Sequence, residues 1–230
     1  MLDFSRFKAL TFDCYGTLID WESGIFSAMR PILDAHDKNV SDSQLLELYA
    51  EFEVAAEEGE YRPYREVLRS VVQEFGKRLH FTPTENEMRS LPDSVASWRP
   101  FPDTISALQK LATRYRLFVI SNIDDDMFAA TRKHLGVSFA GAVTAQQARS
   151  YKPSHNNFRL ALERLGLRND EVLHVGQSIY HDVIPAQSLR IATVWVNRPS
   201  PRPNAGAARA AKGKPDLEVN SLAGLAELAA

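Results

Sequence analysis

The chain has 230 residues, and its 27 basic and 29 acidic side chains give a formal net charge of -2. This length allows one large domain or a core with a modest insert, and the near-neutral balance argues against nucleic acid or an anionic membrane surface as a partner. The single cysteine, Cys14, excludes an internal disulfide framework. No window approaches the roughly 20 apolar residues of a membrane span, and no signal-peptide pattern opens the chain. We therefore expect a cytoplasmic protein whose partner is a small molecule.

Five short apolar runs, rich in β-branched and aromatic residues, are separated by segments with helical periodicity. Such runs are typical of buried parallel strands, and the intervening segments, among them 103–114 and 156–165, are typical of crossover helices. The pattern predicts an α/β fold with a doubly wound parallel sheet of the Rossmann type. The predicted strands are FKALTFD at 7–13, RLFVIS at 116–121, AVT at 142–144, EVLHVG at 171–176 and IATVWV at 191–196.

A long helical interval follows the first strand. It predicts four helices and no strand, which indicates a helical cap at 22–97 inserted into a core made of 1–21 and 98–230. The sequence RPFPD at 99–103 suits a return hinge, since each proline biases the residue before it away from helix. Near the end of the chain, 198–215 is rich in Pro, Ala, Gly and Arg and predicts a mobile surface loop before a last helix at 221–228. The four cap helices are predicted at 23–36, 42–57, 64–79 and 84–98.

Polar residues follow each of the first four predicted strands. Asp13 ends the first, Ser121 and Asn122 end the second, Lys152 follows the third, and 177–182 (QSIYHD) follows the fourth. Each alone could be a turn residue, a helix cap or a solvated loop. Because ligands of an open parallel sheet bind outside the carboxyl ends of its strands, four such groups in register predict one site.

The order of these motifs resembles the haloacid dehalogenase superfamily over nearly the whole chain. The motifs are D-x-Y-G-T-L at 13–18, S-N at 121–122, Y-K-P at 151–153 and V-G-Q-S-x-x-H-D at 175–182. Within the superfamily, D-x-Y-G-T with Y-K-P is similar to the L-2-haloacid dehalogenase branch, whereas phosphatases carry D-x-D. The resemblance implies a Rossmann-like core with a helical cap, and homodimers are common in that branch.

Two substitutions argue against a metal-dependent phosphatase. A phosphatase of this type uses a magnesium ion and an acid that protonates the leaving alcohol. Tyr15 stands where the acid would be, and the neutral amide Gln177 stands where a metal-binding acid is usual. Because Mg²⁺ prefers anionic oxygen ligands, Asp13 and Asp182 alone would hold it poorly. We therefore expect neither a metal nor another cofactor.

The resemblance implies covalent catalysis by an aspartate. Asp13 would attack C2 of a small 2-substituted carboxylic acid, expel the substituent and form an ester that water hydrolyses. Lys152 would pair with Asp13, and Asp182 would orient Lys152 or the hydrolytic water. Asn122 would assist the leaving group. The other predicted substrate-binding residues are Tyr15, Thr17, Ser121, Gln177 and Ser178.

The cap departs from the branch that the chain resembles. Those dehalogenases usually hold the departing halide with an arginine on the second cap helix, and this chain reads LYAEFE at 48–53. Glu51 or Phe52 is expected near that position, where a carboxylate would repel an anion. Arg62 and Arg65 are the nearest substitutes, but they are more readily explained as exposed helix charges. Trp21 and His181 could each line the site or serve a structural purpose.

Three alternatives to a 2-haloacid dehalogenase stay open. One is a hydrolase of another activated 2-substituted acid, such as azetidine-2-carboxylate, because NID at 122–124 and SYKPSHNNF at 150–158 resemble a related branch that handles that compound. The second is a phosphatase of the same fold, and the third is a non-catalytic binding protein. Halide release, phosphate release or neither would separate these classes.

Overall fold

A six-stranded parallel sheet forms the centre of the computed structural model, which describes residues 2–230. The strand order is β3-β2-β1-β4-β5-β6, with all pairs parallel, so the chain reverses its direction of winding next to β1. The expected doubly wound α/β fold is confirmed. The strands are β1 (Ala9–Phe12), β2 (Arg116–Ser121), β3 (Gly141–Thr144), β4 (Val172–Gly176), β5 (Ala192–Val196) and β6 (Leu217–Val219).

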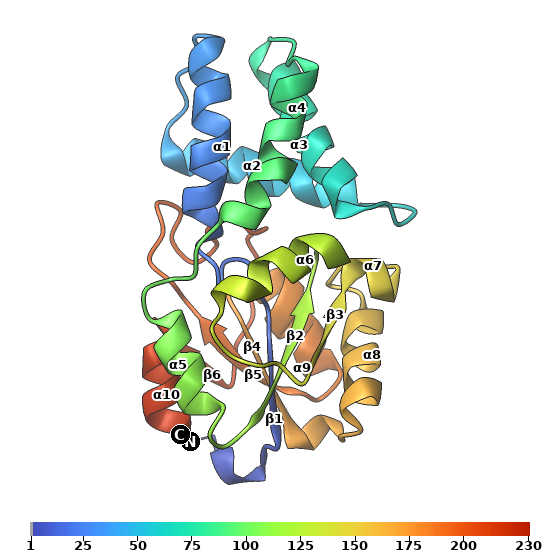
Figure 1. The fold of residues 1–230 in the computed structure, drawn as a ribbon, viewed down its shortest axis with the longest axis vertical. Coiled ribbons are helices and arrows are strands. Elements are labelled where there is room, and N and C mark those ends of the chain that lie inside the picture. The colour runs from blue at the N-terminus through green and yellow to red at the C-terminus, as the bar shows by residue number, and fades with distance from the viewer. Residues whose placement is uncertain (1) are drawn as a thin grey trace.

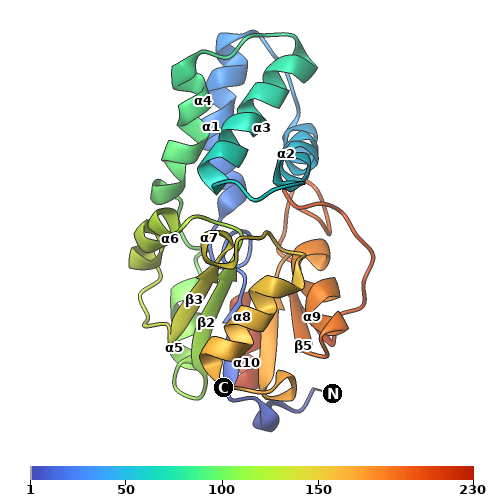
Figure 2. The ribbon, with the colours of Figure 1, turned by 90° about the vertical axis from the view of Figure 1, so that its right-hand side faces the viewer.

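Helices cover both faces of this sheet (Figures 1 and 2). One face packs in the larger apolar cluster with α5 (Thr104–Leu111) and α10 (Leu222–Ala229). The other face packs with α8 (His155–Leu165) and α9 (Ile184–Ser188). This double cover explains why the central strands are continuous apolar runs, since neither face meets water. Two further short helices, α6 (Asp125–Thr131) and α7 (Ala145–Ala148), follow β2 and β3.

Four helices between β1 and β2 gather above the carboxyl edge of the sheet (Figure 1). Within the described chain, the interval 22–97 contains helices and no strand. The helices α2 and α4 each begin with a capping box, in which Ser41 or Thr84 exchanges hydrogen bonds with the residue three positions on. The helices are α1 (Trp21–Ala35), α2 (Asp42–Glu57), α3 (Tyr64–Leu79) and α4 (Glu85–Ser94), with a 3-10 turn at Val95–Ser97.

Two local expectations were wrong. The first cap helix begins at Trp21, because Asp20 accepts a hydrogen bond from the Ser23 backbone and acts as the N-cap in place of Ser23. The segment 198–215 is not simply a surface loop: Ala207 is fully buried, and the segment is tied to the first cap helix where the Ser200 hydroxyl donates to Glu22. The sequence analysis also missed the short strand β6. In residues 2–230, no helix combines the length and apolar character that a membrane crossing requires.

Candidate active site

The loop after β1 holds the Asp13 carboxylate in a fixed position. The Asp13 backbone N–H donates to the Val175 carbonyl on the neighbouring strand (2.9 Å), and the Thr17 hydroxyl donates to Asp13 Oδ2 (2.7 Å). Gln177 N–H in turn donates to the Thr17 oxygen (2.8 Å). Gly16 has φ of 91°, and a side chain there would meet Trp21 at 2.7 Å, so this turn requires glycine. Asp13 therefore projects from a rigid strand end.

Lys152 lies next to Asp13 and is almost completely buried. Its ammonium group donates to Asp13 Oδ1 (2.8 Å), to Asp182 Oδ1 (2.6 Å) and to the Ile120 carbonyl (3.1 Å). These three bonds use all three protons of the ammonium. Lysine is rarely buried unless it is paired, and here one cation is shared by two carboxylates. The arrangement fixes Asp13 and Asp182 on opposite sides of the same charge.

Asp182 is anchored from three directions. His174 on β4 pairs with Asp182 Oδ1 through Nε2 (3.1 Å), while His174 Nδ1 bonds the Thr11 hydroxyl (2.9 Å). The Ser178 backbone N–H donates to Asp182 Oδ2 (3.3 Å). These partners occupy both oxygens of Asp182 and hold its carboxylate against Lys152.

Burial and charge set the protonation of this cluster. Burial raises the pKa of Asp13, against the opposing influence of Lys152. For Asp182, burial acts in the same direction, but Lys152 and His174 outweigh it and lower the pKa. Burial alone would lower the pKa of Lys152, yet the two carboxylates together raise it, so Lys152 stays protonated.

The residues predicted from the strand ends all lie together. Thr17 contacts Asp13 directly, and the others line a cavity of about 40 Å³ between core and cap. This cavity accommodates only a small molecule. Its lining is Asp13, Tyr15, Trp21, Glu53, Glu57, Tyr64, Ser121, Asn122, Lys152, Gln177, Ser178, His181 and Asp182.

Within residues 2–230, two lining side chains carry a buried polar atom for which no partner is found. These atoms are Ser121 Oγ and His181 Nε2, the ring nitrogen opposite the one that bonds Ser178. Burial lowers the pKa of His181 to about 4, so the ring is neutral at pH 7. Buried polar atoms are normally hydrogen-bonded, so unpartnered atoms at a cavity wall are suited to a ligand or a water molecule.

The side chains of three other predicted residues make hydrogen bonds to neighbouring protein groups. The Tyr15 hydroxyl bonds the Thr131 hydroxyl on α6 (2.7 Å), so its polar tip is engaged with the core. The Asn122 side chain accepts from the Lys152 backbone N–H (2.6 Å) and donates to the Lys152 carbonyl (3.1 Å), so it holds the lysine loop. The Gln177 amide donates to the Ala205 carbonyl (2.9 Å).

The cap contributes carboxyl groups that the sequence analysis missed. Glu53 on α2 is 4% exposed and lines the cavity, and half-buried Glu57, one turn further on, accepts from the Asn122 amide (3.3 Å). The expectation for Glu51 and Phe52 was wrong: Glu51 is exposed and pairs with an arginine of α3, and Phe52 packs against Phe75. The register of α2 places the next residue, Glu53, toward the site instead.

No arginine lines the cavity within residues 2–230. Arg65 on α3 pairs with Asp93 and Asp126, whereas Arg62 lies before α3, is half-buried and donates to the Ala56 carbonyl, so Arg62 is not the exposed helix charge that was expected. The site therefore offers no guanidinium to a departing anion.

The cluster does not fit a magnesium ion. Asp13 and Asp182 already share the Lys152 ammonium, and the Gln177 amide is directed to a backbone carbonyl. Among residues 2–230, no group of three His, Cys, Asp or Glu side chains is arranged to hold a metal. Mg²⁺ requires a near-octahedral set of oxygen ligands, which these side chains do not provide.

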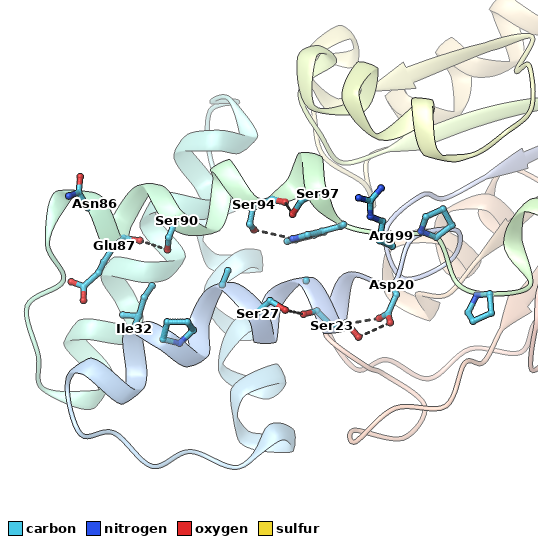
Figure 3. Close-up of a pocket in the computed structure, with 16 residues that line it drawn as sticks. Asp20, Ser23, Ser27, Ile32, Asn86, Glu87, Ser90, Ser94, Ser97 and Arg99 are labelled. Carbon is cyan, nitrogen blue, oxygen red and sulfur yellow. Dashed lines mark hydrogen bonds between the residues drawn. The ribbon is translucent and has the colours of Figure 1, made fainter.

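A larger cavity of about 820 Å³ lies along the cap, between α1 and α4 (Figure 3). Serines and apolar side chains line most of it. The side chains of Asp20, Glu87 and Arg99 are spread along its length rather than gathered at one point. It lacks the convergence of charged groups seen around Asp13, so the smaller cavity is the candidate active site.

A doubly wound core with a helical cap, a strand-end aspartate and a buried lysine define a hydrolase of the haloacid dehalogenase type. The family model described as haloacid dehalogenase-like hydrolase matches residues 7–189, and the chain belongs to this family. The resemblance proposed from the motifs is thereby confirmed.

Two dehalogenases and one solved dehalogenase structure are similar to this chain along most of their length. The chain is 25% identical over 203 residues to haloacetate dehalogenase H-2 of Moraxella sp. (strain B), covering 84% of this chain and 87% of that protein. It is also 25% identical over 237 residues to an (S)-2-haloacid dehalogenase of Pseudomonas sp. (strain YL), covering 96% and 94%. The L-2-haloacid dehalogenase of Xanthobacter autotrophicus with chloropropionic acid covalently bound has the same fold, with a TM-score of 0.78, 22% identity and coverage of 96% and 98%.

Proposed function

We propose that this hydrolase acts without a metal on a small 2-substituted carboxylic acid, with Asp13 as the nucleophile. The observation that carries the proposal is the shared ammonium of Lys152, which contacts both Asp13 and Asp182 in a buried cavity. Tyr15 at the position of the usual acid supports the same conclusion. Within residues 2–230, a phosphate monoester would find no set of ligands for a magnesium ion, and a tyrosine in place of the acid at position 15.

The reaction has two steps. An oxygen of Asp13 attacks C2, the bond from C2 to the substituent breaks, and the bonding electrons leave with the substituent. Water then attacks the aspartyl carbonyl carbon, releasing a 2-hydroxy acid and restoring the carboxylate. Thr17 and Lys152 hold Asp13 in line, so one oxygen needs no reorientation before attack.

The remaining polar groups suit substrate and water. We propose that Ser121 Oγ binds the substrate carboxylate and that Ser178 positions His181, whose free nitrogen Nε2 receives a proton from the hydrolytic water. Neutral His181 is the form that can accept this proton. The small cavity supports a substrate of few carbon atoms.

A single turnover in oxygen-18 water with enzyme in excess tests the ester mechanism. Water attacks the aspartyl carbonyl, so label is expected in Asp13, detected by peptide mass spectrometry, while the hydroxyl of the first product stays unlabelled. Asp13→Asn supplies the control, because an amide cannot form the ester. Labelled product from the first turnover, with unlabelled Asp13, would reduce Asp13 to a general base.

A further inference from the structure

Asp124 of the core caps a helix of the cap. It occupies the N-cap position of α6, which lies on the cap side of the core (Figure 1), but its side chain makes no capping bond to that helix. Instead, Asp124 Oδ1 accepts a hydrogen bond from the Tyr64 backbone N–H (2.9 Å), and Oδ2 accepts one from the Arg65 backbone N–H (3.0 Å). Tyr64 and Arg65 are the first two residues of α3. A carboxylate of the core thus serves as the N-cap of a helix in the cap.

The helix α3 has no N-cap side chain from its own segment. Its N-cap residue is Pro63, which makes no capping bond, whereas α1, α2 and α4 are each capped by the side chain of the residue directly before them. The first N–H groups of a helix have no partner within the helix, and a carboxylate placed there also meets the positive end of the helix dipole. The N-terminus of α3 therefore depends on Asp124, which is 60 positions from Tyr64 in the chain.

The Asp124 carboxylate is buried and takes its hydrogen bonds from the cap. It is 4% exposed, and the Tyr61 hydroxyl donates a third bond to Oδ1 (3.3 Å). The Arg65 guanidinium is directed to Asp93 and Asp126 instead. A buried carboxylate is costly unless it is hydrogen-bonded. Because displacement of α3 would break these bonds together, Asp124 favours the position of α3 that the structure shows.

The two chain crossings between core and cap lie side by side. Ile19 and Pro100 form an antiparallel β-bridge, and the Asp20 backbone N–H donates to the Arg99 carbonyl (2.8 Å). Two adjacent crossings form a hinge, about which the attached unit can rotate. Contacts away from the hinge, such as those of Asp124, therefore set how the cap lies on the core.

The position of α3 controls one wall of the candidate active site. Tyr64 lines the cavity, and its hydroxyl donates to Oε1 of Glu53, the cap carboxyl group that lines the same cavity. The core supports this end of α3 a second time, because the hydroxyl of Tyr151, the residue before Lys152, donates to the Arg62 carbonyl (2.8 Å). A shift of α3 would move Tyr64 and Glu53 relative to the nucleophile.

We infer that Asp124 is a positioning residue, which holds the cavity closed by capping α3 across the interface between core and cap. The inference rests on the proposed function, because this cavity is the one in which Asp13 reacts. A protein whose binding-competent form is only partly populated binds its ligand more weakly in proportion to that fraction, whereas saturating ligand restores the competent form. Loss of Asp124 should therefore act on KM more than on kcat.

Asp124→Ala removes the cap of α3, and Asp124→Asn keeps one acceptor oxygen at nearly the same size. The probe substrates are chloroacetate and (S)-2-chloropropionate, followed by chloride release. Asp124→Ala should raise KM by about 10-fold or more while kcat changes by less than about threefold, and Asp124→Asn should lie between it and the wild type. Amide hydrogen exchange in the peptide that begins α3 should become faster in Asp124→Ala, since Tyr64 and Arg65 lose their acceptors.

Two controls separate positioning from the stability of a helix. Pro63 is exposed, so Pro63→Asp in the Asp124→Ala background gives α3 a cap from its own segment without a link to the core. This double variant should regain slow exchange and much of the urea midpoint but keep the raised KM. Thr84→Ala removes the N-cap of α4, whose bonds go to Glu87 of the same helix, so it should lower the urea midpoint and leave KM and kcat unchanged.

Each outcome decides between positioning and stability alone. A wild-type KM in Asp124→Ala would overturn the inference, and so would a wild-type KM in the double variant, which would reduce Asp124 to a stabiliser of α3. If Asp124→Ala fails to fold, Asp124→Asn and the double variant decide by the same criteria. Failure of the proposed function is seen separately, as missing oxygen-18 label in Asp13 of the wild type. Hydrogen exchange then decides, because unchanged exchange at the start of α3 in Asp124→Ala contradicts capping across the interface.

Discussion

Lys152→Met tests the centre of the site, because methionine keeps the length of the side chain and removes the shared charge. Lys152 is 1% exposed, and its ammonium makes three hydrogen bonds, two of them to carboxylates. Breaking a buried ion pair by removing one partner costs about 3–5 kcal/mol. If that cost falls on the transition state, it corresponds to a loss in turnover of about 100- to 5,000-fold.

The pH dependence of the variant has a defined sign. Without Lys152, only the hydrogen bond from Thr17 still opposes burial, so the pKa of Asp13 rises further and a larger fraction of it is protonated at a given pH. Residual turnover should therefore increase as pH rises. Lys152 also lowers the pKa of Asp182, which stabilises the fold above the unfolded value of about 4. That contribution is lost as pH falls below about 4, so the stability difference between wild type and variant should shrink in acid.

Lys8→Met provides a matched control. Lys8 also pairs with a carboxylate, Glu171 at 2.6 Å, but its side chain is 64% exposed. An exposed pair contributes about 0–1 kcal/mol, so this variant should unfold at nearly the wild-type urea concentration and keep full activity. Turnover and urea unfolding measured on both variants give the comparison. Lys152→Met within about twofold of wild type in turnover would refute the reasoning.

Two further measurements probe the same cluster. Thr17→Val removes the hydroxyl that donates to Asp13 and accepts from Gln177, so kcat should fall by about 10-fold or more, with Thr17→Ser restoring most of it; equal rates in the two variants would contradict this role. Turnover of the better probe substrate should survive excess EDTA, because the site does not fit a metal; loss of activity on chelation with recovery on added Mg²⁺ would support the phosphatase alternative.

Much of the core could be predicted because its signals are local. Each central strand is a short apolar run; Asp13 follows the first run directly, and Lys152 and Asp182 lie in the connections that leave β3 and β4, so the parallel arrangement brings these three proposed site residues to one edge. The three-residue strand β6 was missed because so short a run carries no period.

Long-range contacts account for what the sequence did not reveal. The segment 198–215 resembles a solvated loop in composition, yet the Ser200 bond to Glu22 and the Gln177 bond to Ala205 join positions far apart in the chain. Glu53 was overlooked within an acidic run. A signal was available, since Glu53 follows Tyr49 by four residues and so shares the buried face of α2.

Core and cap carry different parts of the proposed chemistry. Similarity to dehalogenases in the core motifs therefore supports the nucleophile but does not identify the substrate. We propose that 1–21 with 98–230 and the cap at 22–97 act as two units: the core supplies the nucleophile with its lysine, and the cap supplies the group that meets the substituent. The core motifs resemble the dehalogenase pattern, and two haloacid dehalogenases are 25% identical to the chain along most of its length. The cap presents Glu53 to the cavity, and no arginine of residues 2–230 lines it. Reversing the charge at the leaving atom changes which bond can break while leaving the attack by Asp13 unchanged. The nucleophile can thus be inferred from the family, whereas the substrate must be inferred from the cap.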